Sequence, residues 1–371
     1  MKRFLLIILI ALLGAVSCYR EEVAAPSAGN CELKIDFGTG LLRTRAGDGN
    51  VADGGGIYID VTDPENPIPD LVILVVKNAT NTVVGTYPDP APDSGVDSKL
   101  ETLTDATAMS VTFKSLDEGE HTVYAFANTG GYWHMVGQGG GQDADEYLLS
   151  LTTKSAIEGL KFSDLFATVG ASVCPYDENN VPDRLPLSAK GSVNVSSLHT
   201  GEVSLEMQRC VAKVTAEFVN NTGDSLTLFD YRNIIRGMCP NSAYVIPGDP
   251  DYPAGTLAGD IIASETQLGI PAADAQDSSK PGTRTMNWYV FPSSGPYTCD
   301  IGFTLFKNEV NEHTYTYSNL PVHDDHAVSI PSLPRNRHLH IVTKISKGTT
   351  VSFNFEVAGW GEPIVEQVLF D

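Results

Sequence analysis

The stretch Cys31-Glu32-Leu33-Lys34-Ile35-Asp36-Phe37 shows the pattern that decides the fold of this chain. Apolar and charged side chains alternate in it without interruption, and successive residues of a β-strand point to opposite faces of its sheet. The stretch therefore predicts a half-buried strand over residues 31–37. Its apolar side chains would face a core, and its charged side chains would face water.

Similar short segments, rich in Val, Ile, Thr, Tyr or Phe, recur along the rest of the chain. Clusters of Gly, Pro, Asn and Asp separate them, which is typical of strands joined by turns. We predict further strands at 57–62, 71–77, 82–87, 109–115, 121–127, 191–196, 202–207, 210–219, 225–231, 243–246, 285–291, 298–306, 313–318, 338–345, 350–357 and 363–370.

One helix is predicted at about 154–168, where Ser155 and Glu158 have the spacing of a capping box. Helices and strands do not alternate, which argues against a parallel βαβ architecture. The pattern favours an all-β fold of two antiparallel β-sandwich domains in tandem, with a short helix in the first. We expect the N-terminal domain at residues 31–202 and the C-terminal domain at 203–371.

The N-terminus predicts export and a lipid anchor. A basic start, a 13-residue apolar run from Phe4 to Val16 and the sequence Ala15-Val16-Ser17-Cys18 read as a lipoprotein signal peptide over residues 1–17. Acylation would fall on Cys18, and an ordinary signal peptide with an incidental cysteine is the alternative. Residues 18–30, rich in Ala, Pro, Ser and Gly, are expected to form a solvated tether.

Composition excludes some classes of partner. The chain has 371 residues, with 24 Lys and Arg against 46 Asp and Glu, a net charge of −22. Binding to the phosphates of nucleic acid needs clustered cations, so we expect no nucleic acid partner. Hydrophobic residues make up 42% and charged residues 19%, which indicates a folded chain and not a disordered acidic one.

We find no motif that predicts a catalytic, cofactor-binding or metal site, and we expect no enzyme. The segment His323-Asp324-Asp325-His326 could ligate a metal, but no third ligand is apparent. His338 and His340 share one face of a strand and could pair on a metal, although exposed strand histidines are far commoner. Asp143-Ala144-Asp145-Glu146 matches only part of a calcium loop. Trp133, beside a glycine-rich loop, could stack on a sugar or peptide, although a core aromatic is the simpler interpretation.

The five cysteines after Cys18 are Cys31, Cys174, Cys210, Cys239 and Cys299. An odd number leaves at least one thiol unpaired, and the spacing lacks a CxxC motif. Cys31 and Cys210 lie in strand-like runs, where small apolar side chains fill a core.

Five stretches, in order along the chain, carry a family resemblance. They are Leu116–Asn128 with its Val123-Tyr124 and Ala127-Asn128 pairs, Leu185-Pro186-Leu187-Ser188-Ala189, Val203–Val214 with Arg209 and Ala212-Lys213, Leu333-Pro334-Arg335-Asn336, and Val357-Ala358-Gly359-Trp360 followed by an apolar tail. Together with the lipoprotein signal they resemble the fimbrillins, subunits of type V pili of Gram-negative anaerobes. Ala189 departs from the pattern, because the family tends to have glycine there.

The resemblance implies two transthyretin-like sandwiches and a structural role in pilus assembly and cell adhesion. It implies a palmitate-bearing lipid anchor in the cell outer membrane, and a place in the fimbrium after maturation. The implied partners are other fimbrial subunits in a homo- or heteropolymer, a trypsin-like maturation protease and a host or bacterial surface receptor. No cofactor is implied. The alternative is a surface lipoprotein that binds glycan or peptide without polymerising.

Cleavage in the family follows an arginine after the first strand. Here Arg43-Thr44-Arg45-Ala46 comes after residues 31–37, and a cut after Arg45 would make Ala46 the new N-terminus. Arg43 is a second possible cleavage site. A loop that merely contains two arginines is the alternative interpretation.

If residues 31–37 form a core strand, cleavage would allow that strand to leave and an exposed groove would need a replacement strand. The C-terminal segment is a candidate donor because it is apolar on both faces. Ile364, Val368 and Phe370 lie on one face, with Val365 and Leu369 on the other. An ordinary last strand of the second domain is the alternative.

Overall fold

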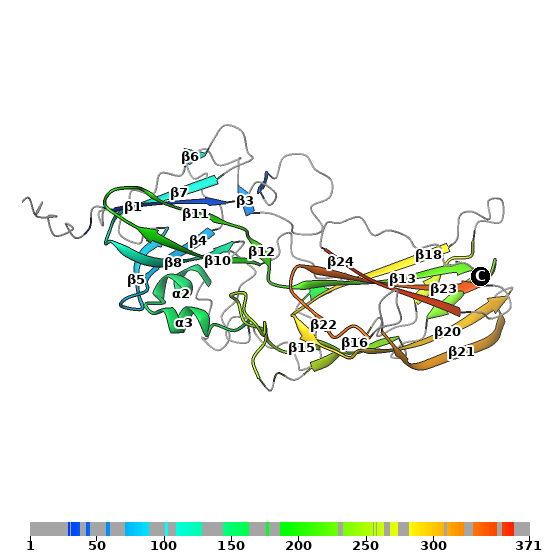
Figure 1. Ribbon diagram of the computed structural model, residues 1–371. Coiled ribbons are helices and arrows are strands. Elements are labelled where there is room, and N and C mark those ends of the chain that lie inside the picture. The colour runs from blue at the N-terminus through cyan, green and yellow to red at the C-terminus, as the bar shows by residue number, and fades with distance from the viewer. Residues whose placement is uncertain are drawn as a thin grey trace, which may run out of the picture.

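The computed structural model confirms an all-β fold, shown in Figure 1 as two packed halves side by side. The structure describes residues 29, 31–37, 42–44, 57–59, 71–88, 101–102, 109–127, 144–162, 176–177, 186–228, 233–254, 256, 258–262, 268–273, 282–307, 310–322, 329–346 and 351–359. In this part of the chain no helix is both long and apolar enough to cross a bilayer.

The first half is a sandwich of two sheets. One sheet has the order β11-β1-β7-β6, and the other has the order β12-β10-β8-β4-β5. Their strands are β1 (Cys31–Phe37), β4 (Leu71–Lys77), β5 (Thr82–Tyr87), β6 (Glu101–Thr102), β7 (Met109–Leu116), β8 (Gly119–Ala127), β10 (Leu187–Val195), β11 (Gly201–Leu205) and β12 (Gln208–Arg209).

The second half is a sandwich of the same kind. One sheet has the order β24-β23-β13-β18-β9, and the other has the order β16-β15-β20-β14-β17 with β21 added to β20. Their strands are β9 (Tyr176–Asp177), β13 (Ala212–Asn221), β14 (Leu226–Leu228), β15 (Ile234–Pro240), β16 (Ala258–Ile262), β17 (Leu268–Ile270), β18 (Gly282–Val290), β20 (Thr298–Lys307), β21 (Val310–Pro321), β23 (Arg337–Ser346) and β24 (Val351–Gly359).

Two small pairs complete the strand list. They are β2 (Leu42–Thr44) with β3 (Ile57–Ile59), and β19 (Ser293–Ser294) with β22 (Ser332–Leu333).

Each half contains a parallel strand pair within an otherwise antiparallel sandwich. β1 runs parallel to β11, and β13 runs parallel to β23. The sequence predicted antiparallel sheets, because alternation within a strand identifies its buried face but not the direction of its neighbour. β11 spans the boundary expected at residue 203 and pairs with the first half, and the exact domain limits remain a prediction.

The helical region differs from the expectation. The helices in the described part of the chain are α2 (Ala144–Ser150) and α3 (Lys154–Glu158), so the predicted helix at 154–168 ends early and α2 was not foreseen. Thr153, not Ser155, is the N-cap of α3, since its hydroxyl accepts a hydrogen bond from the Ala156 N–H at 3.3 Å.

The chain leaves helical geometry after α3 because backbone groups of the second half replace the helical hydrogen bonds. Phe162 N–H donates to the carbonyl of Ala243 at 2.9 Å, and Val245 N–H donates to that of Leu160 at 3.0 Å. The strand predicted at 243–246 is accordingly a single bridge between Lys161 and Tyr244, which corrects that prediction.

Three clusters of buried side chains hold the molecule together. One fills the first sandwich and one fills the second. The third lies between the outer face of the sheet containing β4, the two helices and residues 243–246 of the second half. β4 therefore buries both faces: Leu71, Ile73 and Val75 contribute to the first core, whereas the alternate side chains contribute to the third cluster.

Candidate functional site

The first strand, β1, lies in the interior of its sheet. It pairs in parallel with β11, with Ile35 opposite Val203, and antiparallel with β7, with Ile35 opposite Val111. β11 ends the order of this sheet, and β1 is its only ladder partner in the described part of the chain. Loss of β1 would therefore leave the backbone N–H and C=O groups of β11 and β7 that face it without hydrogen-bond partners.

The alternation read from the sequence is confirmed in β1. Cys31, Leu33, Ile35 and Phe37 are each at most 2% exposed, and they contribute to the first core. On the other face the Lys34 ammonium and the Asp36 carboxylate form an ion pair at 3.0 Å. β1 thus has the burial of a core strand on one face and the polarity of a surface strand on the other.

The groove that β1 occupies has a floor supplied by the opposite sheet. Five side chains of that sheet belong to the same core cluster and are each at most 2% exposed: Leu71, Ile73, Val75, Val123 and Ala125. Adjacent strands lie about 4.8 Å apart, so removal of β1 would open a gap of about 9.6 Å between β11 and β7. Such a gap accepts one extended chain and offers it hydrogen bonds on both sides.

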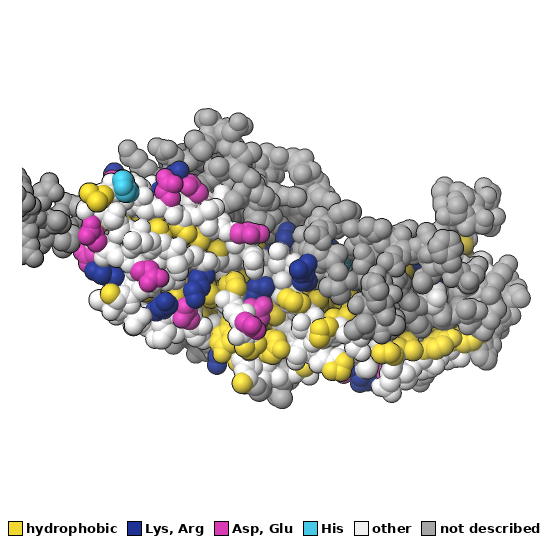
Figure 2. All heavy atoms as spheres, viewed as in Figure 1, with side chains coloured by type: hydrophobic (Ala, Val, Ile, Leu, Met, Phe, Trp, Pro, Cys, Tyr) yellow, Lys and Arg dark blue, Asp and Glu magenta, His cyan; other side chains and the backbone are white. Residues whose placement is uncertain are grey.

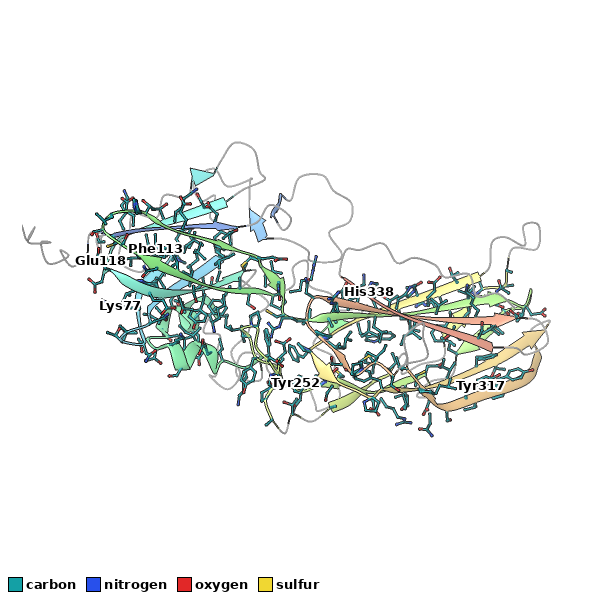
Figure 3. All side chains as sticks on the ribbon, in the orientation of Figure 1. Lys77, Phe113, Glu118, Tyr252, Tyr317 and His338 are labelled. Atoms are coloured by element: carbon teal, nitrogen blue, oxygen red, sulfur yellow. The ribbon has the colours of Figure 1, made fainter. Side chains whose placement is uncertain are left out.

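A polar cluster holds the chain where it enters β1. The carboxylate of Asp117, in the turn between β7 and β8, accepts the Gly29 N–H and pairs with the Lys77 ammonium at 2.7 Å. The hydrogen bond and charge of Lys77 lower the pKa of Asp117. Gly29 adopts a φ of +86°, which favours glycine, and Figure 3 shows Lys77 and Glu118 at this end of the molecule.

The neighbouring turn is tied to the same end. Glu118 accepts hydrogen bonds from the Ser197 N–H at 2.7 Å and from the Ser197 hydroxyl, and Ser197 lies in the turn between β10 and β11. These bonds lower the pKa of Glu118. Both turns lie at the end of the groove where β1 begins, and the bonds between Glu118 and Ser197 join them to each other without β1.

Of the predicted cleavage residues, Arg43 lies on β2, where it is opposite Tyr58 of β3. Arg45 and Ala46 lie outside the described residues, as do the lipidation residue Cys18 and the donor-strand residues Ile364, Val365, Val368, Leu369 and Phe370. These assignments stay predictions.

The rejected metal candidates can be placed in part. His338 and His340 stack with ring centroids 6.0 Å apart; His338 Nε2 lies 2.8 Å from the Thr215 hydroxyl and His340 Nε2 lies 3.0 Å from the Glu217 carboxylate. Among the residues that the structure describes, no group of three ligands suited to a metal ion is found. Trp133, Asp143 and His323–His326 lie outside those residues.

Four cysteines can be placed: Cys31, Cys210, Cys239 and Cys299 are buried free thiols. Burial raises the pKa of the Cys210 thiol to about 11 and that of Cys299 to about 12, so both stay protonated and act as apolar filling. Cys174 lies outside the described residues.

The sequence did not predict β11 as the parallel neighbour of β1, nor the junction between the two halves. The parallel partner β11 has a strand-like sequence, but nothing local links it to residues 31–37. Residues 243–246 were predicted as a strand, and nothing local in their sequence indicated that they pack on the first half.

No protein-family model matches the sequence, and no curated protein matches it. Solved structures do. A tip fimbrial protein from Porphyromonas gingivalis, solved with a C-terminal truncation, has 11% identity over 89% of this chain and 100% of that chain, at a TM-score of 0.47.

A fimbrial assembly protein from Parabacteroides distasonis has 10% identity over 88% of this chain and 98% of that chain, at a TM-score of 0.43. A fimbrilin from Porphyromonas gingivalis has 13% identity over 90% of this chain and 98% of that chain, at a TM-score of 0.42.

Proposed function

We propose that this chain is a structural subunit of surface fimbriae, and that a strand donated by a neighbouring subunit replaces β1 during polymerisation. One observation carries the proposal: β1 is buried in the interior of a sheet at the start of the described fold, and an arginine-bearing segment follows it. A single cut in that segment would leave β1 held by noncovalent contacts alone.

The free energy that holds β1 is large enough to prevent early assembly. Burial of Leu33, Ile35 and Phe37 contributes about 1.5–3 kcal/mol each, or roughly 5–9 kcal/mol together. That sum is comparable to the net stability of a whole domain. The uncleaved precursor would therefore keep its groove filled and stay monomeric during export.

After cleavage the same free energy becomes available to another strand. An extended segment with alternating apolar residues would pair with β11 and β7 and would cover the core residues that β1 had covered. The tail at 363–370 is our candidate donor. Its residues Ile364, Val368 and Phe370 share one face, which could cover the core residues that β1 had covered.

The proposal includes the route to the cell surface. Acylation of Cys18 would anchor the precursor in the outer membrane, and a cut after Arg45 would separate the body from that anchor. A cleaved subunit would then be held in the fimbrium by its neighbours, in a homo- or heteropolymer that serves cell adhesion.

A reversible cross-link tests the exit of β1 directly. Lys34 on β1 and Thr112 on β7 are cross-strand partners on the outer face, so Lys34→Cys with Thr112→Cys should form a disulfide that pins β1 in its groove. The matched control is Glu120→Cys with Asn194→Cys, which joins β8 and β10, two strands that stay in place.

We expect the β1-locked variant to be cleaved after Arg45 but to remain monomeric until dithiothreitol is added. The control should polymerise with its disulfide intact. Polymers of the β1-locked variant that form with the cross-link unreduced would refute strand replacement at β1.

The donor is tested separately. Deletion of residues 363–371 should leave cleavage intact and abolish incorporation of the next subunit, whereas Arg43→Ala with Arg45→Ala should trap membrane-bound monomers. Normal polymers in the deletion variant, together with blocked polymers in the locked variant, would show that β1 is replaced by a different segment.

A further inference from the structure

A loop of the second half, residues 244–252, forms one wall of a cleft at the junction of the two halves. Two hydrogen bonds close this loop on itself: Tyr244 N–H donates to the Asp251 carbonyl at 2.9 Å, and Gly248 N–H donates to the Asp251 carboxylate at 3.0 Å. The loop is therefore a closed turn. Gly248, Asp249 and Pro250 at its tip are exposed, whereas Val245 and Ile246 are buried in the third core cluster.

Buried Arg335 fixes that loop to the body of the protein. Arg335 is 6% exposed, and its guanidinium donates to the Asp251 carboxylate at 3.1 Å, to the Tyr244 carbonyl at 2.8 Å and to the Val245 carbonyl at 3.0 Å. A planar guanidinium with three partners in one loop holds it in one geometry. The wall is thus organised before any ligand arrives.

The opposite wall belongs to the first half, at α3 and β10. Glu158 Oε1 accepts hydrogen bonds from the Tyr124 hydroxyl at 2.8 Å and from the Lys190 ammonium at 2.6 Å. Burial by itself would raise the pKa of Glu158, but these two bonds and the charge of Lys190 lower it, so the carboxylate is ionised. Both bonds go to Oε1, which leaves Oε2 without a partner among the described residues.

Between the walls lies a cleft of about 460 Å³, in the size range of small-molecule sites. Its lining combines charged groups with aromatic and apolar ones, and consists of Glu158, Lys190, Tyr244, Tyr252, Ile246, Pro247, Gly248, Asp249, Pro250 and Ala254. Figure 2 shows hydrophobic side chains beside basic and acidic ones at this junction, and Figure 3 places Tyr252 there.

We propose that this cleft binds a neutral saccharide at the end of a surface glycan. A sugar ring presents a flat face of C–H groups and an edge of hydroxyls that both donate and accept hydrogen bonds. The half-buried rings of Tyr244 and Tyr252 offer apolar faces with polar tips, while Lys190 donates and the carboxylates of Glu158 and Asp249 accept.

The charges select against other ligands. Two carboxylates in the cleft and a net charge of −22 for the chain repel an anionic ligand such as a sialylated glycan. A cationic peptide would have to compete with Lys190, which already pairs with Glu158 at 2.6 Å. A neutral polyol can bind without breaking the ion pair between Lys190 and Glu158 and without repulsion from the carboxylates.

The test applies the purified, detergent-solubilised full chain to an array printed with neutral oligosaccharides, their sialylated counterparts and basic peptides. The variants are Tyr252→Ala, Tyr252→Phe and Asp249→Asn. Tyr317→Ala, on β21 of the second half, is the matched control for loss of a tyrosine elsewhere. Asp249 is exposed, so Asp249→Asn tests the site even if a tyrosine variant folds poorly.

We expect binding to a subset of the neutral oligosaccharides. The affinity should fall at least tenfold in Tyr252→Ala and severalfold in Asp249→Asn, and should change less than twofold in Tyr317→Ala. Tyr252→Phe should retain most of the affinity, since the ring face is kept. Binding of the sialylated glycans or peptides alone, no binding at all, or binding that Tyr252→Ala and Asp249→Asn leave unchanged would overturn the proposal.

Discussion

β1 of the first half and β23 of the second half occupy matching places in their sheets. Each lies between a parallel neighbour, β11 or β13, and an antiparallel neighbour, β7 or β24. Each buries alternate apolar side chains: Ile35 in β1 and Ile341 in β23 are at most 3% exposed. The two strands are therefore similar in local chemistry and in surroundings.

They differ in how the chain holds them. β23 is covalently continuous with β22 before it and β24 after it, whereas β1 begins the described fold and its far end leads into the segment with Arg43 and Arg45. One cut would release β1, and two cuts would be needed to release β23. Under the proposed strand replacement, position along the chain, and not strand chemistry, would make β1 the replaceable one of two similar strands.

The largest expected effect comes from truncating the two matching isoleucines. In the uncleaved protein, Ile35→Ala and Ile341→Ala should each lower the free energy of unfolding by about 2–5 kcal/mol, because each leaves a cavity in a packed core. After cleavage and assembly, Ile35→Ala should leave the stability of the polymer unchanged, because β1 is no longer part of it. Ile341→Ala should still lower the free energy of unfolding by the same amount as in the precursor.

Urea denaturation of the precursor and of the assembled form measures both effects. A cost of Ile35→Ala that persists in the polymer would mean that β1 stays in place, and the distinction between β1 and β23 would then fail.

A smaller effect is expected at Gly191 of β10, which faces β11. A Cβ atom there would lie 2.6 Å from Leu205 Cδ2 and 2.9 Å from Val203 Cγ2. Gly191→Ala should cost the precursor about 1–3 kcal/mol, because β11 is held in place by β1 and cannot move away freely. If β1 leaves, β11 can shift, so the same substitution should cost less in cleaved protein that has not yet assembled. An equal cost in both forms, measured by thermal unfolding, would argue that β11 is fixed without β1.

The smallest effect concerns pH. His121 on β8 is fully buried, and burial lowers its pKa below the usual value of 6.5; the charge of Lys77 acts in the same direction, while the Gly119 carbonyl and Asp117 oppose it. The folded state thus keeps His121 neutral where the unfolded state takes up a proton. The contribution of His121 to the free energy of unfolding is therefore complete above about pH 6.5. It falls as the pH is lowered, by no more than about 1.4 kcal/mol per pH unit.

In the second half, Asp300 offers the contrast. Burial would raise its pKa, but hydrogen bonds from Asn319 N–H and Arg236 hold it below 3.8, so its contribution is lost only in stronger acid. Unfolding curves at pH 7.5 and 5.5 should therefore show a loss of stability that His121→Gln removes. A loss that persists in His121→Gln would assign the pH dependence to other groups.

Local chemistry was sufficient to predict the faces and bounds of single strands. The alternation of residues 31–37 identified the buried face of β1, and β4 and β5 have the predicted bounds of 71–77 and 82–87. Pairing could not be predicted in the same way: the partner of β1 in β11 lies far along the chain, and either direction of pairing satisfies the same alternation.

The junction was beyond prediction for a related reason. Residues 154–168 have helical spacing of apolar side chains, yet Leu160 and Phe162 form backbone hydrogen bonds with Ala243 and Val245 of the other half. A long-range contact thus overrides a local propensity, and the cleft near Tyr252 exists only because of it.

The shared third core has a mechanical consequence. Phe162 of the first half stacks on Phe291 of the second, with ring centroids 4.9 Å apart, and Arg335 of the second half donates a hydrogen bond to the Ser188 hydroxyl of the first at 3.5 Å. Because a large apolar interface suppresses motion between domains, one subunit should behave as a single stiff rod. In the proposed filament of such rods, bending under the drag of flowing liquid would concentrate at the joints between subunits, where a donated strand would lie.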